Sequence, residues 1–166
     1  MTTRGALIAV CGVGAAADTA YVSRLIAGEL TRRRSPGAVL LTRARGAEAH
    51  AALDPALQRR RVVVADLGPL DEDLDAVLAI AAVVVCTLRG DVDRNEVAEA
   101  VTRHTTRRSA RWLAAVTTAP DEVHHVRLLA AALPPAVPLI AVGDPATDRA
   151  ASSKALDAAL LAAALG

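Results

Sequence analysis

Short apolar runs alternate with segments of helical periodicity along most of this chain. The apolar runs lie at residues 6–11, 38–41, 62–65, 82–86, 112–116 and 139–142. Continuous apolar runs of this length are typical of strands that are covered on both faces, as in a parallel sheet. The sequence therefore predicts an α/β fold: a three-layer sandwich with a mostly parallel sheet of about six strands and helices on both faces.

The segments between the runs carry helix signals. Helices are expected over Thr19–Arg33, 46–57 and 93–104. Three more are expected: one whose first turn holds the acids at 71–73, one that opens at 120–122, and a last one capped by Ser152 and Ser153. We expect Pro55 to interrupt the second of these, because proline removes a backbone donor. No internal repeat or linker divides the chain, so residues 1–166 are expected to form a single domain.

The composition of the chain argues against a nucleic-acid-binding function. Tyr21 and Trp112 are the only aromatic residues, and the net charge is +1. A nucleic-acid partner is therefore not expected, because base stacking needs aromatic side chains and phosphate binding needs a basic surface. Arginines cluster at residues 32–34, 59–61 and 103–111. We interpret them as solvated surface, with contact to nucleic acid or to an acidic partner as the alternative.

The positions of the cysteines and the lengths of the apolar runs indicate the cellular compartment in which the protein is expected. Cys11 and Cys86 each lie inside an apolar run, which favours two buried thiols in a reducing environment over a disulfide or half of a metal site. No run reaches the 18 or so apolar residues of a transmembrane segment, and the N-terminal run is too short for a signal peptide. A cytoplasmic protein is expected, with no metal and no cofactor.

The loop after the first apolar run is the main candidate for a binding site. It consists of Gly12, Val13, Gly14, Ala15, Ala16, Ala17, Asp18 and Thr19. A Walker A loop, G-x-x-x-x-G-K-[ST], aligns with it without a gap. Gly12 takes the place of the first glycine and Thr19 that of the magnesium-binding hydroxyl. Ala17 replaces the second glycine, and Asp18 replaces the essential lysine.

With these residues the chain resembles the ParA/MinD family of P-loop ATPases, whose loop reads G-K-G-G-x-G-K-[ST]-T. The resemblance places the two family lysines at Val13 and Asp18, and the only lysine of the chain, Lys154, lies far downstream. It also implies that 64–69 corresponds to the Walker B region, with Asp66 as its acid. The stretch 116–120 then lies where the family has an adenine-contacting asparagine. The resemblance implies a P-loop NTPase-like fold.

The replacement of lysine by aspartate decides what this loop can bind. A P-loop surrounds phosphates with backbone N–H groups and a lysine, so its potential is positive. Two like charges about 4 Å apart repel by roughly 1 kcal/mol in water and about 4 kcal/mol at an effective dielectric near 20. The alanines at 15–17 also disfavour backbone angles that glycine allows. We therefore expect neither tight ATP binding nor hydrolysis, and no catalytic residue is assigned.

Each acid and hydroxyl of this region also has a structural interpretation. Asp18 is expected to act as the N-cap of the following helix, and Thr19 as a first-turn residue rather than a metal ligand. Asp66 is either a relic Walker B acid or a solvent-facing acid at a strand end; a phosphoacceptor role is a weaker alternative. His50 and His104 are interpreted as surface residues. His124 and His125 are expected on the wetter side of their helix, because adjacent helical residues point apart.

Three functions are compatible with these features. The first is a non-catalytic ParA/MinD-like scaffold or positioning protein that acts through protein partners, for which a homodimer is one arrangement. Within the superfamily, TadZ/CpaE-like proteins often carry atypical Walker loops. The second is a small chelatase-like enzyme that uses the same crevice, although no histidine follows the first strand. The third is a nucleotide sensor that binds without turnover.

Overall fold

Parallel strands build the centre of the molecule. The computed structural model describes residues 5–14, 18–33, 38–42, 46–59, 62–105, 110–118 and 123–143. The strands are β1 (Leu7–Gly12), β2 (Ala38–Leu41), β3 (Val62–Pro69), β4 (Val83–Arg89), β5 (Arg111–Thr118) and β6 (Leu139–Gly143). They form one six-stranded sheet in the order β2-β3-β1-β4-β5-β6, and every neighbouring pair is parallel.

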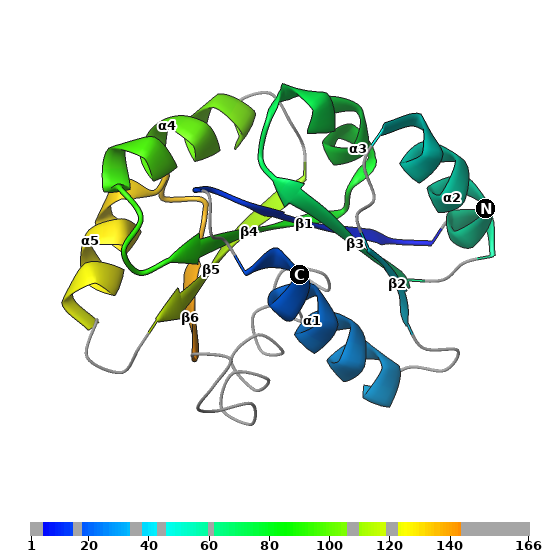
Figure 1. Cartoon of the computed structure of the whole chain (residues 1–166), viewed down its shortest axis with the longest axis horizontal. Coiled ribbons are helices and arrows are strands. Elements are labelled where there is room, and N and C mark those ends of the chain that lie inside the picture. Colours follow the sequence, from blue (N-terminus) through cyan, green and yellow to red (C-terminus); the bar gives the residue numbers. More distant parts are fainter. Residues whose placement is uncertain are drawn as a thin grey trace.

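Helices connect these strands. They are α1 (Thr19–Arg33), α2 (Gly46–Gln58), α3 (Asp75–Ile80), α4 (Arg94–Thr105) and α5 (Val123–Ala132), and a 3-10 turn, η1 (Glu72–Leu74), precedes α3. From β1 the chain moves outward to β2, but every later crossover moves in the opposite direction across the sheet. Because parallel crossovers are right-handed, this reversal places α1 on one face and α2 to α5 on the other. Figure 1 shows this arrangement.

Two hydrophobic cores lie on the two faces of the sheet. The α1-side core contains Val22 and Ile26 of α1, packed on alternate residues of the strands such as Val10 and Leu113. The opposite core is larger and contains Leu53, Leu78, Val101 and Trp112 among its buried residues. Successive strand residues point to opposite faces. The continuous apolar runs are therefore explained by a sheet that is buried on both sides.

Each apolar run is a strand in the structure, and the fold class predicted from the sequence is confirmed. The expected interruption at Pro55 is wrong, because α2 continues through this residue to Gln58. Leu53 and Leu57, on either side of the proline, are buried in the core and hold both halves of α2 against the sheet. The expected last helix, after Ser152 and Ser153, lies outside the described residues.

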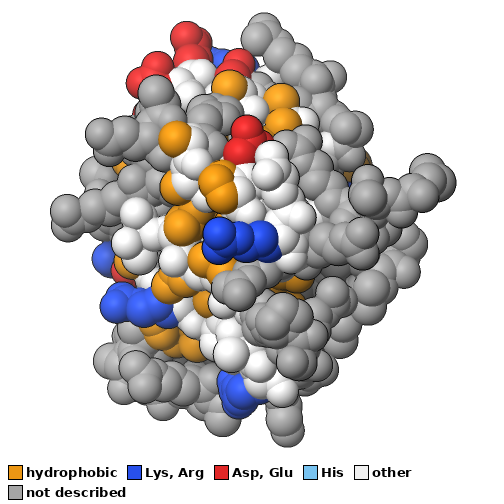
Figure 2. Space-filling model, turned by 90° about the vertical axis from the view of Figure 1, so that its right-hand side faces the viewer, with side chains coloured by type: hydrophobic (Ala, Val, Ile, Leu, Met, Phe, Trp, Pro, Cys, Tyr) orange, Lys and Arg blue, Asp and Glu red, His pale blue; other side chains and the backbone are white. Residues whose placement is uncertain are grey.

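The edge of the sheet at β2 is less enclosed than its centre. All four residues of β2 are half-buried, whereas all six residues of β1 are buried. Figure 2 shows the side of the molecule that lies to the right in Figure 1, where hydrophobic side chains gather along the middle of the face with basic side chains beside them.

Among the helices in the described ranges, none is both long enough and apolar enough to span a membrane.

Candidate functional site

The carboxyl end of β1 is the topological switch point of this sheet. Its two neighbours are β3 and β4, and the helix that follows β1 covers the face opposite to the helices that follow those neighbours. The loops therefore separate above β1, and open parallel sheets bind their ligands at such a point. The loop that begins at Gly12, which the sequence analysis aligned with a Walker A loop, leaves the sheet here.

Backbone hydrogen bonds hold the first part of this loop to both neighbouring strands. The Gly12 carbonyl accepts a hydrogen bond from Leu70 N at 2.8 Å, and Val13 N donates to the Thr87 carbonyl at 3.1 Å. Gly14 has a φ of 88°, and a Cβ built on it would lie 3.2 Å from Val92 Cγ2. Glycine is therefore required at this position for its backbone angle and for its lack of a side chain. Residues 15–17 of the predicted site lie outside the described residues.

Asp18 lies immediately before α1. Its backbone carbonyl accepts the hydrogen bond of Val22 N at 3.1 Å, as the N-cap position requires. Its carboxylate, however, is engaged by a distant residue: Thr117 Oγ1 donates to Asp18 Oδ2 at 2.9 Å across 99 residues of sequence. Among the described residues, the partner of this carboxylate is therefore the hydroxyl at the end of β5, and not a backbone N–H of the first helical turn.

Thr117 joins three parts of the site. Its hydroxyl also lies 3.3 Å from the Leu88 carbonyl of β4, so one proton is shared between two acceptors or alternates between them. Its own carbonyl accepts a hydrogen bond from Gly90 N at 3.2 Å. The residue is 7% exposed. Sequence reasoning did not single out this residue, although a threonine at the carboxyl end of an apolar run is the kind of signal that marks it.

Thr19 is the first residue of α1, as the sequence predicted. Its side chain is buried, with 9% of the residue exposed. In a Walker A loop the corresponding hydroxyl reaches a magnesium ion in an open phosphate site. Thr19 is therefore a buried residue of the first turn of α1.

Asp66 lies on the neighbouring strand β3, in register with Val10 of β1. The interpretation as a solvent-facing acid is wrong, because Asp66 is only 7% exposed. Its Oδ1 accepts a hydrogen bond from Gly68 N at 3.1 Å, which closes a local turn in which Gly68 has a φ of 69°. The register with β1 shifts just after Asp66, leaving Leu67 as an extra residue, and the pairing resumes with Gly68 opposite Cys11.

Polar groups of β4 complete this edge of the sheet. Thr87 Oγ1 donates to the Cys11 carbonyl at 3.1 Å and is fully buried. At the end of β4, Arg89 Nε donates to Asp91 Oδ1 at 3.1 Å. This hydrogen bond from the Arg89 guanidinium holds the pKa of Asp91 below its ordinary value. The guanidinium nearest the end of β4 thus already has a carboxylate partner, and its charge is partly neutralised.

Three of the four histidines have described side chains, and these lie on α4 and α5. His124 and His125 are exposed on α5, as expected. The interpretation of His104 as a surface residue is wrong: it is 6% exposed, stacks on Trp112, and its Nδ1 lies 3.3 Å from Asp75 Oδ1. His104 follows Val97 and Val101 at helical spacing, and this pattern was a signal of burial. The side chain of His50 lies outside the described residues.

The site can be summarised by the chemistry of its side chains. It presents carboxylates and hydroxyls that bond to one another or to the backbone, with Asp18 at the start of the helix. Within the described ranges, no group of three or more His, Cys, Asp or Glu side chains could hold a metal ion. In comparisons with known proteins, no family model matches this chain and no curated protein matches it significantly.

Proposed function

We propose that this protein is a non-catalytic relative of the ParA/MinD ATPases that serves as a scaffold or positioning factor through contacts with protein partners. One observation carries the proposal: the carboxylate of Asp18 stands before α1, where a P-loop would carry its lysine, and is bonded to Thr117. A helix N-terminus attracts anions. Here the N-terminus of α1 follows the carboxylate of Asp18, so a bound anion would be repelled by this negative charge.

Two further features support the proposal. The sheet order places Asp66 on the strand next to β1, which is the placement that a Walker B acid needs beside a Walker A loop. Its burial and its bond to Gly68 N give it a structural role, so it does not need a bound magnesium ion. This architecture lacks the loop lysines that nucleotide binding needs. It therefore favours a function that depends on contacts made by the protein surface.

Isothermal calorimetry with ATP, ADP and GTP in the presence of magnesium tests this proposal. We expect no binding in the micromolar range for the natural chain. Asp18→Lys should bind ATP about tenfold or more tightly than the natural chain, because the variant exchanges repulsion for attraction and each tenfold is about 1.4 kcal/mol. Glu72→Lys is the matched control, since it makes the same change of charge on an exposed residue of η1.

The possible results separate the alternatives. Micromolar binding by the natural chain would contradict the scaffold proposal and favour a nucleotide sensor. Equal gains from Asp18→Lys and Glu72→Lys would show that only overall charge matters, and would remove the role given to the loop. Light scattering after size exclusion tests the homodimer. A partner that co-purifies with the natural chain, together with the absence of nucleotide binding, would support the proposal.

A further inference from the structure

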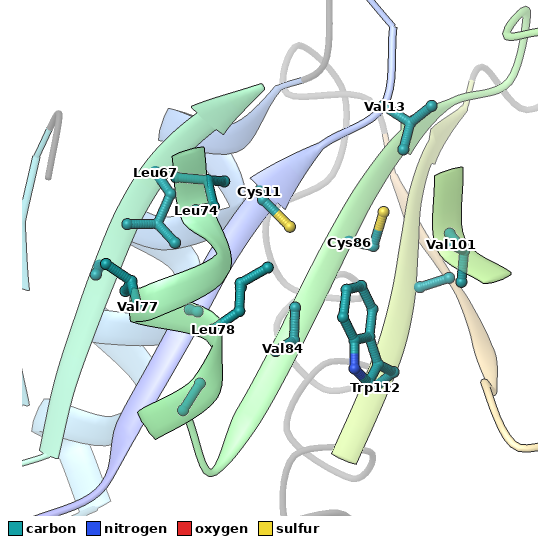
Figure 3. Close-up of a cluster of buried hydrophobic side chains, with 14 of the residues drawn as sticks. Cys11, Val13, Leu67, Leu74, Val77, Leu78, Val84, Cys86, Val101 and Trp112 are labelled. Carbon is teal, nitrogen blue, oxygen red and sulfur yellow. The ribbon is translucent and has the colours of Figure 1, made fainter. Parts of the chain in front are cut away.

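The two cysteines of the chain lie side by side under the candidate loop. Cys11 of β1 is the direct register partner of Cys86 of β4. Both are buried, with 0% exposure, and both belong to the core on the side of α2 to α5. Figure 3 shows the two side chains on the same side of the sheet, in the cluster that also contains Val13 and Trp112.

Strand geometry sets the distance between these thiols. Neighbouring strands are about 4.8 Å apart, so in-register Cα atoms have about this separation. Disulfides span Cα separations of about 4.4–6.8 Å, which includes this value. The two Cβ atoms point the same way and are also about 4.8 Å apart, somewhat beyond the usual 3.5–4.5 Å or so of a disulfide. A bond between them can therefore close, but with strain that makes it easier to reduce.

The surroundings favour a disulfide over a metal ion. The cluster around the pair is apolar, with residues such as Val13, Leu74 and Val84. A disulfide adds no charge to it, whereas a metal dithiolate would leave charge in an apolar environment at considerable cost. Structural zinc needs four ligands. Among the described residues, no third His, Cys, Asp or Glu joins the two thiols in a group able to bind a metal.

We propose that Cys11 and Cys86 form a reversible disulfide across β1 and β4, and that its closure changes the position of the loop that follows β1. The loop is coupled to the pair by two hydrogen bonds. Thr87 Oγ1 donates to the Cys11 carbonyl, and Val13 N donates to the Thr87 carbonyl, both at 3.1 Å. Drawing the two strands together changes the geometry of both bonds. This inference does not depend on the proposed scaffold function.

The chemistry is a thiol–disulfide exchange with a small-molecule disulfide as the oxidant. The thiolate of one cysteine attacks a sulfur of the reagent, which forms a mixed disulfide and releases one small thiol. The second cysteine then attacks the protein sulfur of the mixed disulfide and releases the second small thiol. The protein loses two protons and two electrons, and the reagent gains them. Because both thiols are buried in the core, the first attack requires a local opening of the packing that covers them.

Oxidised glutathione tests the proposal on the full chain under non-denaturing conditions. We expect the intact mass of the monomer to fall by two hydrogen atoms, and a non-reducing digest to link the peptide of Cys11 to that of Cys86. A monothiol should reverse the change. Cys11→Ala and Cys86→Ala should each prevent the loss of two hydrogens. Circular dichroism of the oxidised protein verifies that the fold is retained.

Hydrogen exchange tests the coupling to the loop. The amides of Val13 and Leu88, each two residues after a cysteine of the pair, should change their protection on oxidation, whereas Val101 on α4 should not. The disulfide proposal is overturned if the folded protein keeps its mass, if the link forms only in denaturant, or if the bond forms between two chains. Unchanged protection at Val13 in the oxidised protein would overturn the proposed effect on the loop.

Discussion

The two faces of the sheet bury different kinds of polar side chain. On the face of α2 to α5, the buried imidazole of His104 lies beside the Asp75 carboxylate and stacks on Trp112, whose indole Nε1 has no hydrogen-bond partner among the described residues. On the α1 face, the hydroxyls of Tyr21 and Ser23 are buried and, within the described part of the chain, have no hydrogen-bond partner. An unsatisfied buried hydroxyl costs free energy, whereas a satisfied one is close to neutral. Both faces therefore contain a buried polar group without a partner among the described residues, so we expect apolar packing to be the main source of stability on each.

The substitution with the largest expected effect on stability removes apolar packing between α1 and the sheet. Ile26 is fully buried in the α1-side core. We expect Ile26→Ala to lower the free energy of unfolding by about 2–5 kcal/mol, because it leaves a cavity between α1 and the sheet. Chemical denaturation measures this value. Ile80→Ala is the control, since Ile80 is 44% exposed on α3 and its truncation should change stability by about 0.5 kcal/mol or less.

A smaller effect of opposite sign is expected at Ser23. Its side chain is buried, with 1% of the residue exposed, and its hydroxyl is one of the two without a partner among the described residues of this face. Ser23→Ala should raise the free energy of unfolding by about 1–2 kcal/mol, because it removes a desolvated hydroxyl and adds a better helix former. Tyr21→Phe removes the other hydroxyl and should change stability in the same direction. Destabilisation by both variants would show that these hydroxyls have partners in solution.

The smallest effect is expected on the opposite face. Asp75 lies beside His104, but its side chain is 45% exposed. Asp75→Asn keeps the shape of the side chain and removes its charge. We expect the free energy of unfolding to fall by less than about 1 kcal/mol, because the Asp75 carboxylate is partly in contact with water, which weakens its interaction with His104. Denaturation followed through the fluorescence of Trp112 measures it. A loss of several kcal/mol would mean that the packing of His104 against α3 depends on this charge.

Much of the fold could be predicted from the sequence, because continuous apolar runs of four to six residues between helical segments are typical of strands buried on both faces. What periodicity could not predict is the order of the strands, because it depends on contacts between distant residues. The bond between Asp18 and Thr117 was missed for this reason: it exists only because β5 lies two strands from β1. The burial of His104 was available from its spacing with Val101, but the polar character of histidine outweighed it.

The hydrogen bond from Leu70 N to the Gly12 carbonyl has a mechanical consequence. It fastens the segment between β3 and η1 to the point where β1 ends, so the start of the candidate loop and the approach to α3 share one anchor. The register shift at Leu67 precedes this anchor, and pairing with β1 resumes at Gly68 and Pro69. We therefore expect a displacement at the end of β1 to move the segment that leads to α3 as well as the loop itself.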